Sequence, residues 1–140
     1  MLYLDTSLLV AALTNEAETE RMQRWLGRQA ADDLEISDWV VTEFSSTLSV
    51  KLRAGHIEPA HRADALAMFA RLTTDSFLVV PVSRLQFRTA AGLADQHSLS
   101  LRAGDALHLA VCADHGATLC TLDRRLSDAG PALGIKTMLL

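Results

Sequence analysis

The sequence predicts an α/β fold in which helices flank a central, mainly parallel five-stranded sheet. Short apolar runs of strand length alternate along the chain with amphipathic segments at helical spacing. The 140 residues are 49% hydrophobic, which is typical of a globular protein with its own core. No repeat, low-complexity tract or flexible linker divides the chain. We therefore expect residues 1–140 to form one domain, an α/β/α sandwich.

The first predicted elements are a strand at residues 2–4 and a helix at residues 6–13. The strand is a short apolar run, and the apolar sequence continues directly into the helix. Residues 17–30 place apolar side chains such as Trp25 on one face and arginines on the other, as an amphipathic helix does. Residues 34–36 are the second strand candidate.

A long helix is predicted next. Ser37 or Asp38 is suited to cap its N-terminus, and apolar residues then repeat at helical spacing as far as Leu52. Gly55 ends this pattern. Pro59 is placed to open the following helix at its first turn.

Residues 77–80 are the clearest strand candidate, and Pro81 closes it. Ser83 and Gln86 match a capping box, so we expect a helix that runs to about His97.

The last part of the chain is predicted to hold two helices and two strands. Residues 103–113 are apolar nearly all round, which is typical of a helix buried on most sides. A strand at 118–122 leads into a short helix at 123–129, and Gly130-Pro131 is expected to break that helix. Residues 135–139 form the last predicted strand.

Composition excludes several classes of protein. No apolar run reaches the roughly 18 residues of a membrane-spanning helix. The first residues reach Asp5 without a basic segment, so they do not resemble a signal peptide. Cys112 and Cys120 stand outside any zinc-ligand spacing, so we expect a reduced, cytoplasmic protein without a zinc site. The net charge of −4 predicts only local contacts with phosphates.

Four acidic residues fall at the ends of predicted elements. Asp5 and Asp123 directly follow predicted strands, so both are expected at the carboxyl edge of the sheet, where an open α/β fold has its cleft. Asp105 lies in the first turn of the buried helix, and Glu43 lies in the first turns of the long helix. The four acids are therefore candidates for one shared site.

Each acid taken alone has an ordinary explanation. An Asp after a strand often caps the next helix, and the helix dipole favours an Asp in the first turn. The set is harder to explain in this way, because two carboxylates about 4 Å apart repel by roughly 1 to 4 kcal/mol. Four gathered carboxylates require a cation, and Mg²⁺ or Mn²⁺ suits oxygen ligands.

Four short motifs follow one another over essentially the whole chain. They are Leu4-Asp-Thr-Ser7, Val41-Thr-Glu-Phe44, Arg102-Ala-Gly-Asp-Ala-Leu-His-Leu-Ala110 and Thr121-Leu-Asp123. Each motif alone is common, but their order and spacing resemble the PIN-domain ribonucleases. The toxins of VapBC toxin–antitoxin modules are the most similar in length and layout. Many relatives carry Asn where this chain has Leu122, a departure that touches none of the acids.

The resemblance implies a PIN-like fold and a metal-dependent endoribonuclease that hydrolyses RNA phosphodiester bonds with Mg²⁺ or Mn²⁺. It implies that the acids bind the metal and are catalytic: Asp5, Glu43, Asp105 and Asp123. It implies a polar supporting role for Ser7 and Thr121. The implied partners are the RNA substrate, an inhibitory cognate antitoxin, and a second copy of the chain in a homodimer or a larger toxin–antitoxin assembly.

Several other residues have two interpretations. Arg102, Arg124 and Arg125 lie beside two of the acids, where they are suited to contact RNA phosphates or to act as counter-charges. His108 follows Asp105 by three residues, so it either faces the same cleft or is a hydrogen-bonded core residue. Five apolar side chains are expected in the core, and the resemblance adds an antitoxin groove and a dimer face as roles for Trp25, Leu26, Trp39, Phe44 and Leu48.

Three other functions fit the sequence less well. A non-catalytic PIN-like module that only binds RNA or a partner would tolerate the loss of an acid, and all four are present. A phosphotransfer enzyme of the dehalogenase type needs a second Asp at the place of Ser7. A receiver domain needs a Lys near the last strand, and Lys136 falls inside that predicted strand.

Overall fold

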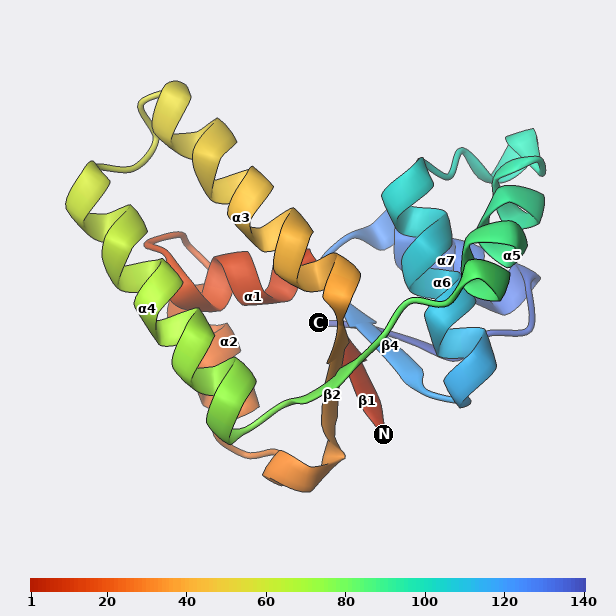
Figure 1. The fold of residues 1–140 in the computed structure, drawn as a ribbon, viewed down its shortest axis with the longest axis horizontal. Helices are drawn as coiled ribbons and strands as arrows, with labels where there is room; N and C mark the ends of the chain where they lie inside the picture. The colour runs from red at the N-terminus through yellow and green to blue at the C-terminus, as the bar shows by residue number, and fades with distance from the viewer.

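A sheet of five parallel strands forms the centre of the computed structural model, which describes all residues 1–140 (Figure 1). The strand order is β3-β2-β1-β4-β5, and every neighbouring pair is parallel. The predicted α/β class is therefore confirmed, with a sheet that is wholly parallel. The strands are β1 (Leu2–Leu4), β2 (Leu34–Ser37), β3 (Leu78–Val80), β4 (Thr118–Thr121) and β5 (Thr137–Leu139).

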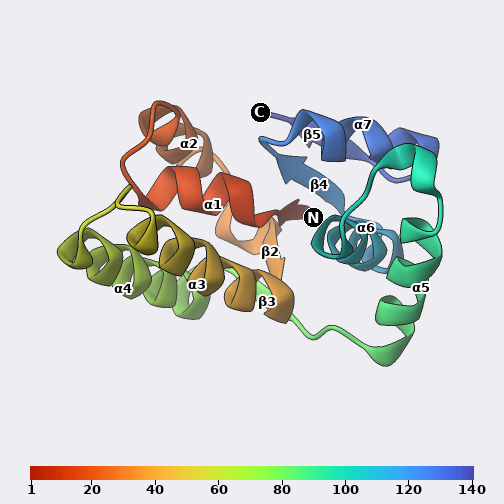
Figure 2. The ribbon, with the colours of Figure 1, turned by 90° about the horizontal axis from the view of Figure 1, so that it is seen from above.

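Seven α-helices flank the sheet in two layers. Figure 2 shows α1–α4 on one side of the sheet and α5–α7 on the other, which confirms the predicted sandwich. Right-handed crossovers explain the layers, because the chain moves outward from β1 to β3 and then crosses back to β4 and β5. The helices are α1 (Thr6–Leu13), α2 (Thr19–Leu26), α3 (Asp38–Arg53), α4 (Pro59–Asp75), α5 (Arg84–Ala94), α6 (Ala103–His115) and α7 (Arg124–Ala132).

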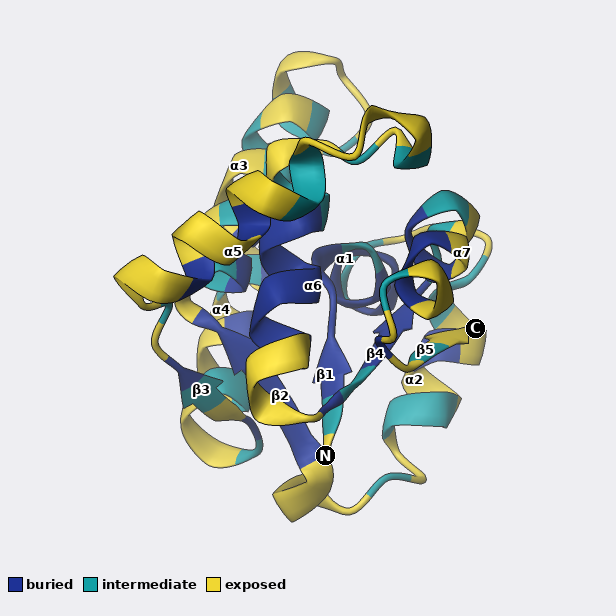
Figure 3. Ribbon diagram, turned by 90° about the vertical axis from the view of Figure 1, so that its right-hand side faces the viewer, coloured by how far each residue is buried: buried dark blue, intermediate teal, exposed yellow.

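Burial is greatest in the central strands and in the helices that cover them (Figure 3). A core of 26 buried residues extends through the sheet into both helix layers. Phe44 and Leu48 of α3 are fully buried, whereas Trp25, Leu26 and Trp39 are half-buried. Phe44 and Leu48 are thus core residues, while Trp25, Leu26 and Trp39 pack against the core and keep part of their surface exposed. None of the helices combines the length and the apolar character that a membrane crossing demands.

Two predicted helices end earlier than expected. α2 spans Thr19–Leu26 instead of residues 17–30, because the backbone after it tightens into hydrogen bonds between residues three apart. α5 ends at Ala94 rather than at about His97, and His97 begins a short 3₁₀ turn. Its predicted capping box is present, with both reciprocal hydrogen bonds.

The predicted break at Gly130-Pro131 is wrong, because α7 continues to Ala132. Pro131 has no N–H, so the Ser127 carbonyl lacks its helical donor. The hydroxyl of Thr137, the first residue of β5, donates to that carbonyl at 2.8 Å. Gly130 permits this approach, since a Cβ there would lie 2.2 Å from Thr137 Cγ2. A tertiary hydrogen bond therefore keeps α7 helical through its proline.

The sheet has one point at which its winding reverses. β1 connects through α1 and α2 to β2 on one side, while β4 is reached by the crossover from β3 and lies on the other side of β1. In open α/β sheets a crevice opens at such a point, beyond the carboxyl ends of the strands. Asp5 follows β1 directly, and Asp123 lies two residues beyond the end of β4, so both acids border this crevice.

Removing the hydroxyl of Thr137 should destabilise the junction of α7 and β5. Thr137→Val keeps the side-chain shape but leaves the Ser127 carbonyl without a donor, so we expect the free energy of unfolding to fall by about 1 to 3 kcal/mol. Urea denaturation followed by circular dichroism measures this change. Thr118→Val is the matched control, since no hydrogen bond involves the Thr118 hydroxyl, and an equal loss in both variants would contradict the interpretation.

The two cysteine thiols should be unreactive in the folded protein. Both are buried, and burial raises the pKa of Cys112 well above its ordinary value. Burial, with the nearby Asp5 carboxylate, raises the pKa of Cys120 to about 12. At pH 8 only on the order of one in ten thousand Cys120 side chains would then be the reactive thiolate. We expect a disulfide reagent to modify neither cysteine until denaturant is added, and rapid labelling of the native protein would contradict this.

Candidate active site

The four predicted acids line one cleft at the carboxyl edge of the sheet. The cleft has a volume of about 340 Å³ and opens beside the starts of α1, α6 and α7 and the first turns of α3. Five of its ten lining residues are acidic. The lining residues are Asp5, Thr6, Ser7, Val10, Glu16, Glu43, Thr47, Asp105, His108 and Asp123. Residues far apart in the sequence thus meet in one place.

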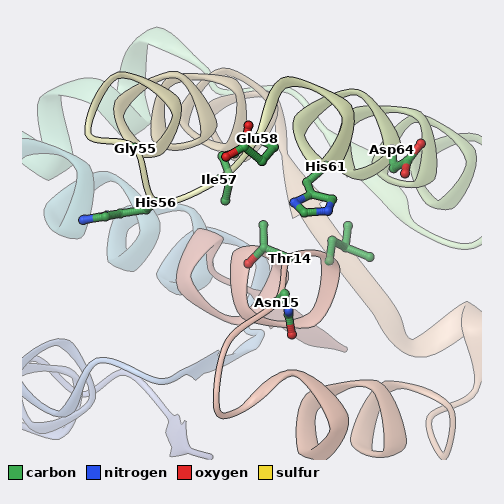
Figure 4. Close-up of a pocket in the computed structure, with 9 residues that line it drawn as sticks. Thr14, Asn15, Gly55, His56, Ile57, Glu58, His61 and Asp64 are labelled. Atoms are coloured by element: carbon green, nitrogen blue, oxygen red, sulfur yellow. The ribbon is translucent and has the colours of Figure 1, made fainter.

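A second cleft of similar size, about 320 Å³, lies between the end of α1 and the start of α4 (Figure 4). His61 and Asn15 approach it from facing elements, whereas the carboxylates of Glu58 and Asp64 point away from His61. None of the four predicted acids lines it. The chemistry predicted from the sequence therefore belongs to the first cleft.

Asp5 is the most deeply held of the four acids, with 3% of its surface exposed. It caps α1, since its Oδ1 accepts from the Leu8 N–H at 3.2 Å, and the same oxygen accepts from the Ser7 hydroxyl at 2.6 Å. Its Oδ2 accepts from the Thr121 hydroxyl at 2.6 Å. Both predicted supporting residues therefore contact Asp5, and both of its oxygens are fixed in direction.

Ser7 and Thr121 also link the ends of β1 and β4. The Leu122 N–H donates to Ser7 Oγ at 3.2 Å, and the Asp123 N–H donates to Thr121 Oγ1 at 2.9 Å. Asp123 in turn caps α7 by accepting from the Leu126 N–H at 3.2 Å. Leu122 contributes its backbone to this link, so an Asn side chain is not needed for it.

Glu43 reaches the cleft from α3 and is held by two donors. Its Oε2 accepts from the Thr6 hydroxyl and from His108 Nε2, the latter at 2.8 Å. His108 Nδ1 lies 2.9 Å from the Tyr3 hydroxyl, which lies 2.7 Å from Ser37 Oγ. This chain is satisfied whether the imidazole carries one proton or two, because the two hydroxyls can exchange donor and acceptor roles.

His108 therefore unites its two interpretations, as a buried hydrogen-bonded residue that also lines the cleft. Thr6, Tyr3 and Ser37 are site residues that the sequence analysis missed. The position of Thr6, directly after Asp5 and at the start of a helix, was an available signal for Thr6 alone.

The surroundings of Glu43 favour its charged form. Burial raises the pKa of Glu43, but the hydrogen bond and charge of His108, together with the Thr6 hydroxyl, outweigh burial and bring the pKa below its ordinary value of 4.5. Burial raises the pKa of Tyr3 well above its ordinary value, so Tyr3 stays a neutral phenol. At neutral pH the chain therefore presents an ionised Glu43 carboxylate to the cleft.

Gly104 gives the Glu43 carboxylate its space. A Cβ at position 104 would lie 2.8 Å from Glu43 Oε1 and 3.4 Å from Trp39 Nε1. The Trp39 N–H is buried without a hydrogen-bond partner of good geometry. The close approach of α3 and α6 at this point therefore depends on the missing side chain of Gly104.

Asp105 and Asp123 share a basic partner, Arg125 of α7. The Arg125 Nη2 lies 3.1 Å from Asp105 Oδ2 and 3.7 Å from Asp123 Oδ2. The Arg102 backbone N–H also donates to Asp105 Oδ2, at 3.0 Å, while the Arg102 side chain is exposed. Arg124 is exposed and lines a neighbouring hollow instead of the cleft. Of the three arginines considered from the sequence, only Arg125 pairs with the acids.

The donor set of the cleft suits a hard divalent cation. Its acidic and hydroxyl side chains offer oxygen ligands, the type that Mg²⁺ and Mn²⁺ prefer, and no Cys lines it. The acids do not already converge as a ligand set of three, because each is held by its own partners.

The protein is thus an α/β domain with a parallel sheet and a group of carboxylates in the cleft where the winding of the sheet reverses. The chain belongs to the PIN domain family, whose family description matches residues 2–130. This match confirms the resemblance drawn from the four motifs. The fold agrees with it, as the following similarities show.

The chain is 32% identical to the ribonuclease VapC35 of Mycobacterium tuberculosis, over 96% of this chain and 93% of that protein. Among solved structures it is similar to VapC20 of Mycobacterium tuberculosis, described as a sarcin–ricin loop cleaving toxin, with a TM-score of 0.74 and 22% identity over 93% and 95% of the two chains. FitAcB of Neisseria gonorrhoeae has a TM-score of 0.72 and 18% identity, and the match covers 99% of this chain and 96% of that chain. VapBC2 of Rickettsia felis, bound to promoter DNA, has a TM-score of 0.73 and 17% identity, and the match covers 100% of this chain and 99% of that chain.

Adding a side chain at position 104 should move Glu43 without unfolding the protein. In Gly104→Ala the new methyl group displaces the Glu43 carboxylate from its donors, and the higher helix propensity of Ala, worth about 1 kcal/mol, offsets part of that loss, so the free energy of unfolding should change little. RNA cleavage, the activity that the resemblance implies, should fall by about tenfold to a hundredfold because a group that misses its position by about 1 Å loses most of its effect. Gly92→Ala in α5 is the control, since a Cβ there meets open space, and equal activity in both variants would contradict the assignment.

Proposed function

We propose that this PIN domain, formed by residues 1–140, is a Mg²⁺- or Mn²⁺-dependent endoribonuclease that acts in the cytoplasm. One observation carries the proposal: four acids separated by up to 118 positions in the sequence line one cleft at the carboxyl edge of the sheet. Asp5, Asp105 and Asp123 also accept hydrogen bonds from backbone N–H groups at helix starts, but capping does not explain why Glu43 reaches the same cleft from α3. The similarity to ribonuclease VapC35 supports RNA as the substrate.

The chain's own residues have distinct parts in this proposal. Asp5, Glu43, Asp105 and Asp123 would hold the cation. A divalent cation supplies the acidity that makes water nucleophilic near neutral pH, and it offsets negative charge on the phosphodiester. Ser7 and Thr121 fix both oxygens of Asp5, while His108 keeps the Glu43 carboxylate oriented and ionised. The acids alone would repel RNA, so the substrate needs the cation for its approach.

The alternative is a PIN-like module that only binds RNA or a partner. Such a module has no need for four acids in one cleft, each oriented by its own hydrogen-bond donors. The arrangement around Asp5 and Glu43 therefore favours the enzyme.

Removing the metal should abolish cleavage of RNA. We expect purified protein to cut total RNA in Mg²⁺ or Mn²⁺, to lose this activity in EDTA, and to regain it when either ion is restored. Cleavage that persists in EDTA would overturn the metal-dependent mechanism. Sequencing of the cut ends would identify the preferred RNA.

Asp5→Asn should remove the activity while the protein stays folded. The amide keeps the shape and can still accept the hydrogen bonds at one oxygen, but it lacks the charge that a cation requires; we expect a loss of at least about a hundredfold. Asp64→Asn is the matched control, because Asp64 lies on α4 at the other cleft. Thermal unfolding followed by circular dichroism shows whether both variants keep the fold.

We also propose that a cognate antitoxin inhibits the enzyme and that the chain forms a homodimer. The similar VapC20 toxin and VapBC2 structures support a toxin–antitoxin pair, and the half-buried Trp25, Leu26 and Trp39 offer apolar surface for contacts. Co-purification of the product of a neighbouring gene, with loss of RNA cleavage in the complex, tests the antitoxin. Light scattering of the isolated chain tests the homodimer, and a monomer at every concentration would exclude it.

A further inference from the structure

Arg125 occupies a position between two parts of the molecule. Its guanidinium pairs with Asp105 and Asp123, and the same side chain lines a hollow of about 510 Å³ outside the acid-lined cleft. The hollow is lined by Ser98, Leu99, Ser100, Arg124, Arg125, Asp128 and Ala129. No other Lys or Arg forms an ion pair with any of the four site acids.

We infer that Arg125 competes with the divalent cation for Asp105 and Asp123, and that its displaced guanidinium then binds an RNA phosphate in the neighbouring hollow. The inference rests on the proposed function, because it assumes that the acids bind a cation and that RNA enters the cleft. It adds an order of events, in which loading of the cation creates the contact that holds the RNA.

The competition follows from where the charges lie. Arg125 Nη2 pairs with Oδ2 of Asp105, and the same oxygen accepts a hydrogen bond from the Arg102 N–H. A cation that takes oxygens of Asp105 and Asp123 meets a guanidinium within ion-pair distance of both, and like charges repel. The absence of a ready ligand set among the acids agrees with this, since two of the four acids pair with Arg125.

Arg125 is free enough to exchange partners. Its side chain is 39% exposed, and the side chains of its partners Asp123 and Asp105 are 36% and 16% exposed, so the two ion pairs lie at the rim of the cleft. Exposed pairs are weak because water competes with them. By contrast, Asp5 and Glu43 are held by hydroxyl and imidazole donors that are buried or partly buried. Neither acid pairs with a Lys or Arg side chain that a metal cation would have to displace.

The hollow suits a phosphate once Arg125 turns toward it. Arg124 already lines it, so two guanidinium groups would face one carboxylate, Asp128. The hydroxyls of Ser98 and Ser100 add uncharged donors on the opposite side. Arginine guanidinium groups bind phosphate oxygens in pairs. Because Arg125 lines the hollow and pairs with two acids of the cleft, a phosphate bound in the hollow would belong to a nucleotide close to the cleaved bond.

Calorimetric titration with Mn²⁺ tests the competition without RNA and without activity. We expect Arg125→Gln to bind Mn²⁺ about tenfold more tightly than the unaltered protein, and Arg125→Lys to lie between them. Arg124→Gln is the matched control, since it removes the neighbouring charge that does not pair with the acids, and its Mn²⁺ affinity should stay within about twofold. Equal or weaker Mn²⁺ binding by Arg125→Gln would overturn the inference.

Binding of RNA tests the second half of the inference. The probe is a fluorescent single-stranded oligoribonucleotide with phosphorothioate linkages, followed by anisotropy at saturating Mn²⁺. Arg125→Gln should bind it about tenfold more weakly, although the variant binds the metal more tightly, and Arg124→Gln should weaken RNA binding alone. A purely structural role of Arg125 would instead weaken both. Unchanged RNA binding by Arg125→Gln would exclude the phosphate contact.

The outcomes also separate this inference from the proposed function. If the unaltered protein cleaves RNA in Mn²⁺ but Arg125→Gln has the same Mn²⁺ affinity, the competition is wrong and the ribonuclease stands. If the unaltered protein neither binds Mn²⁺ nor cleaves RNA, the proposed function is wrong, and the inference falls with it. If Mn²⁺ binds more tightly to Arg125→Gln but RNA is never cleaved, the competition stands and the activity is wrong.

Discussion

The buried carboxylate of Asp5 is the interaction on which the rest of the site depends. It caps the first turn of α1 and accepts hydrogen bonds from the hydroxyls of Ser7 and Thr121. These bonds join the ends of β1 and β4 through one carboxylate. A charge with so little exposure is tolerated only because every oxygen has donors. The same contacts that make burial acceptable also aim the carboxylate at the cleft. Fold and site therefore share one set of hydrogen bonds here.

The other acids show how the cluster is kept from repelling itself. Glu43 is stabilised by the chain that runs through His108 to Tyr3, and Asp105 and Asp123 are neutralised in part by Arg125. The site thus divides into an inner half, in which buried or partly buried donors hold Asp5 and Glu43, and a rim half, in which Arg125 pairs with both Asp105 and Asp123. Adjustments to a ligand are expected in the rim half, because its contacts are the weaker ones.

The sequence predicted the fold class and the acids because both depend on local patterns. Apolar runs marked the strands, and the carboxyl-edge rule placed Asp5 and Asp123 correctly beside the cleft. Contacts between distant elements were beyond such patterns. The Thr137 hydroxyl that preserves α7 at Pro131 lies ten residues from the carbonyl it serves. Likewise, nothing local distinguishes Arg125 from Arg124, yet only one of them reaches the acids.

The bond between Thr121 and Asp5 joins residues 116 positions apart, and it completes the cleft. A ribosome would therefore release almost the whole chain before β4 can pair with β1 and bring Asp123 beside Asp5. Parallel strands with such distant partners also form late in folding. The topology therefore delays assembly of the acid-lined cleft until translation of the chain is nearly finished.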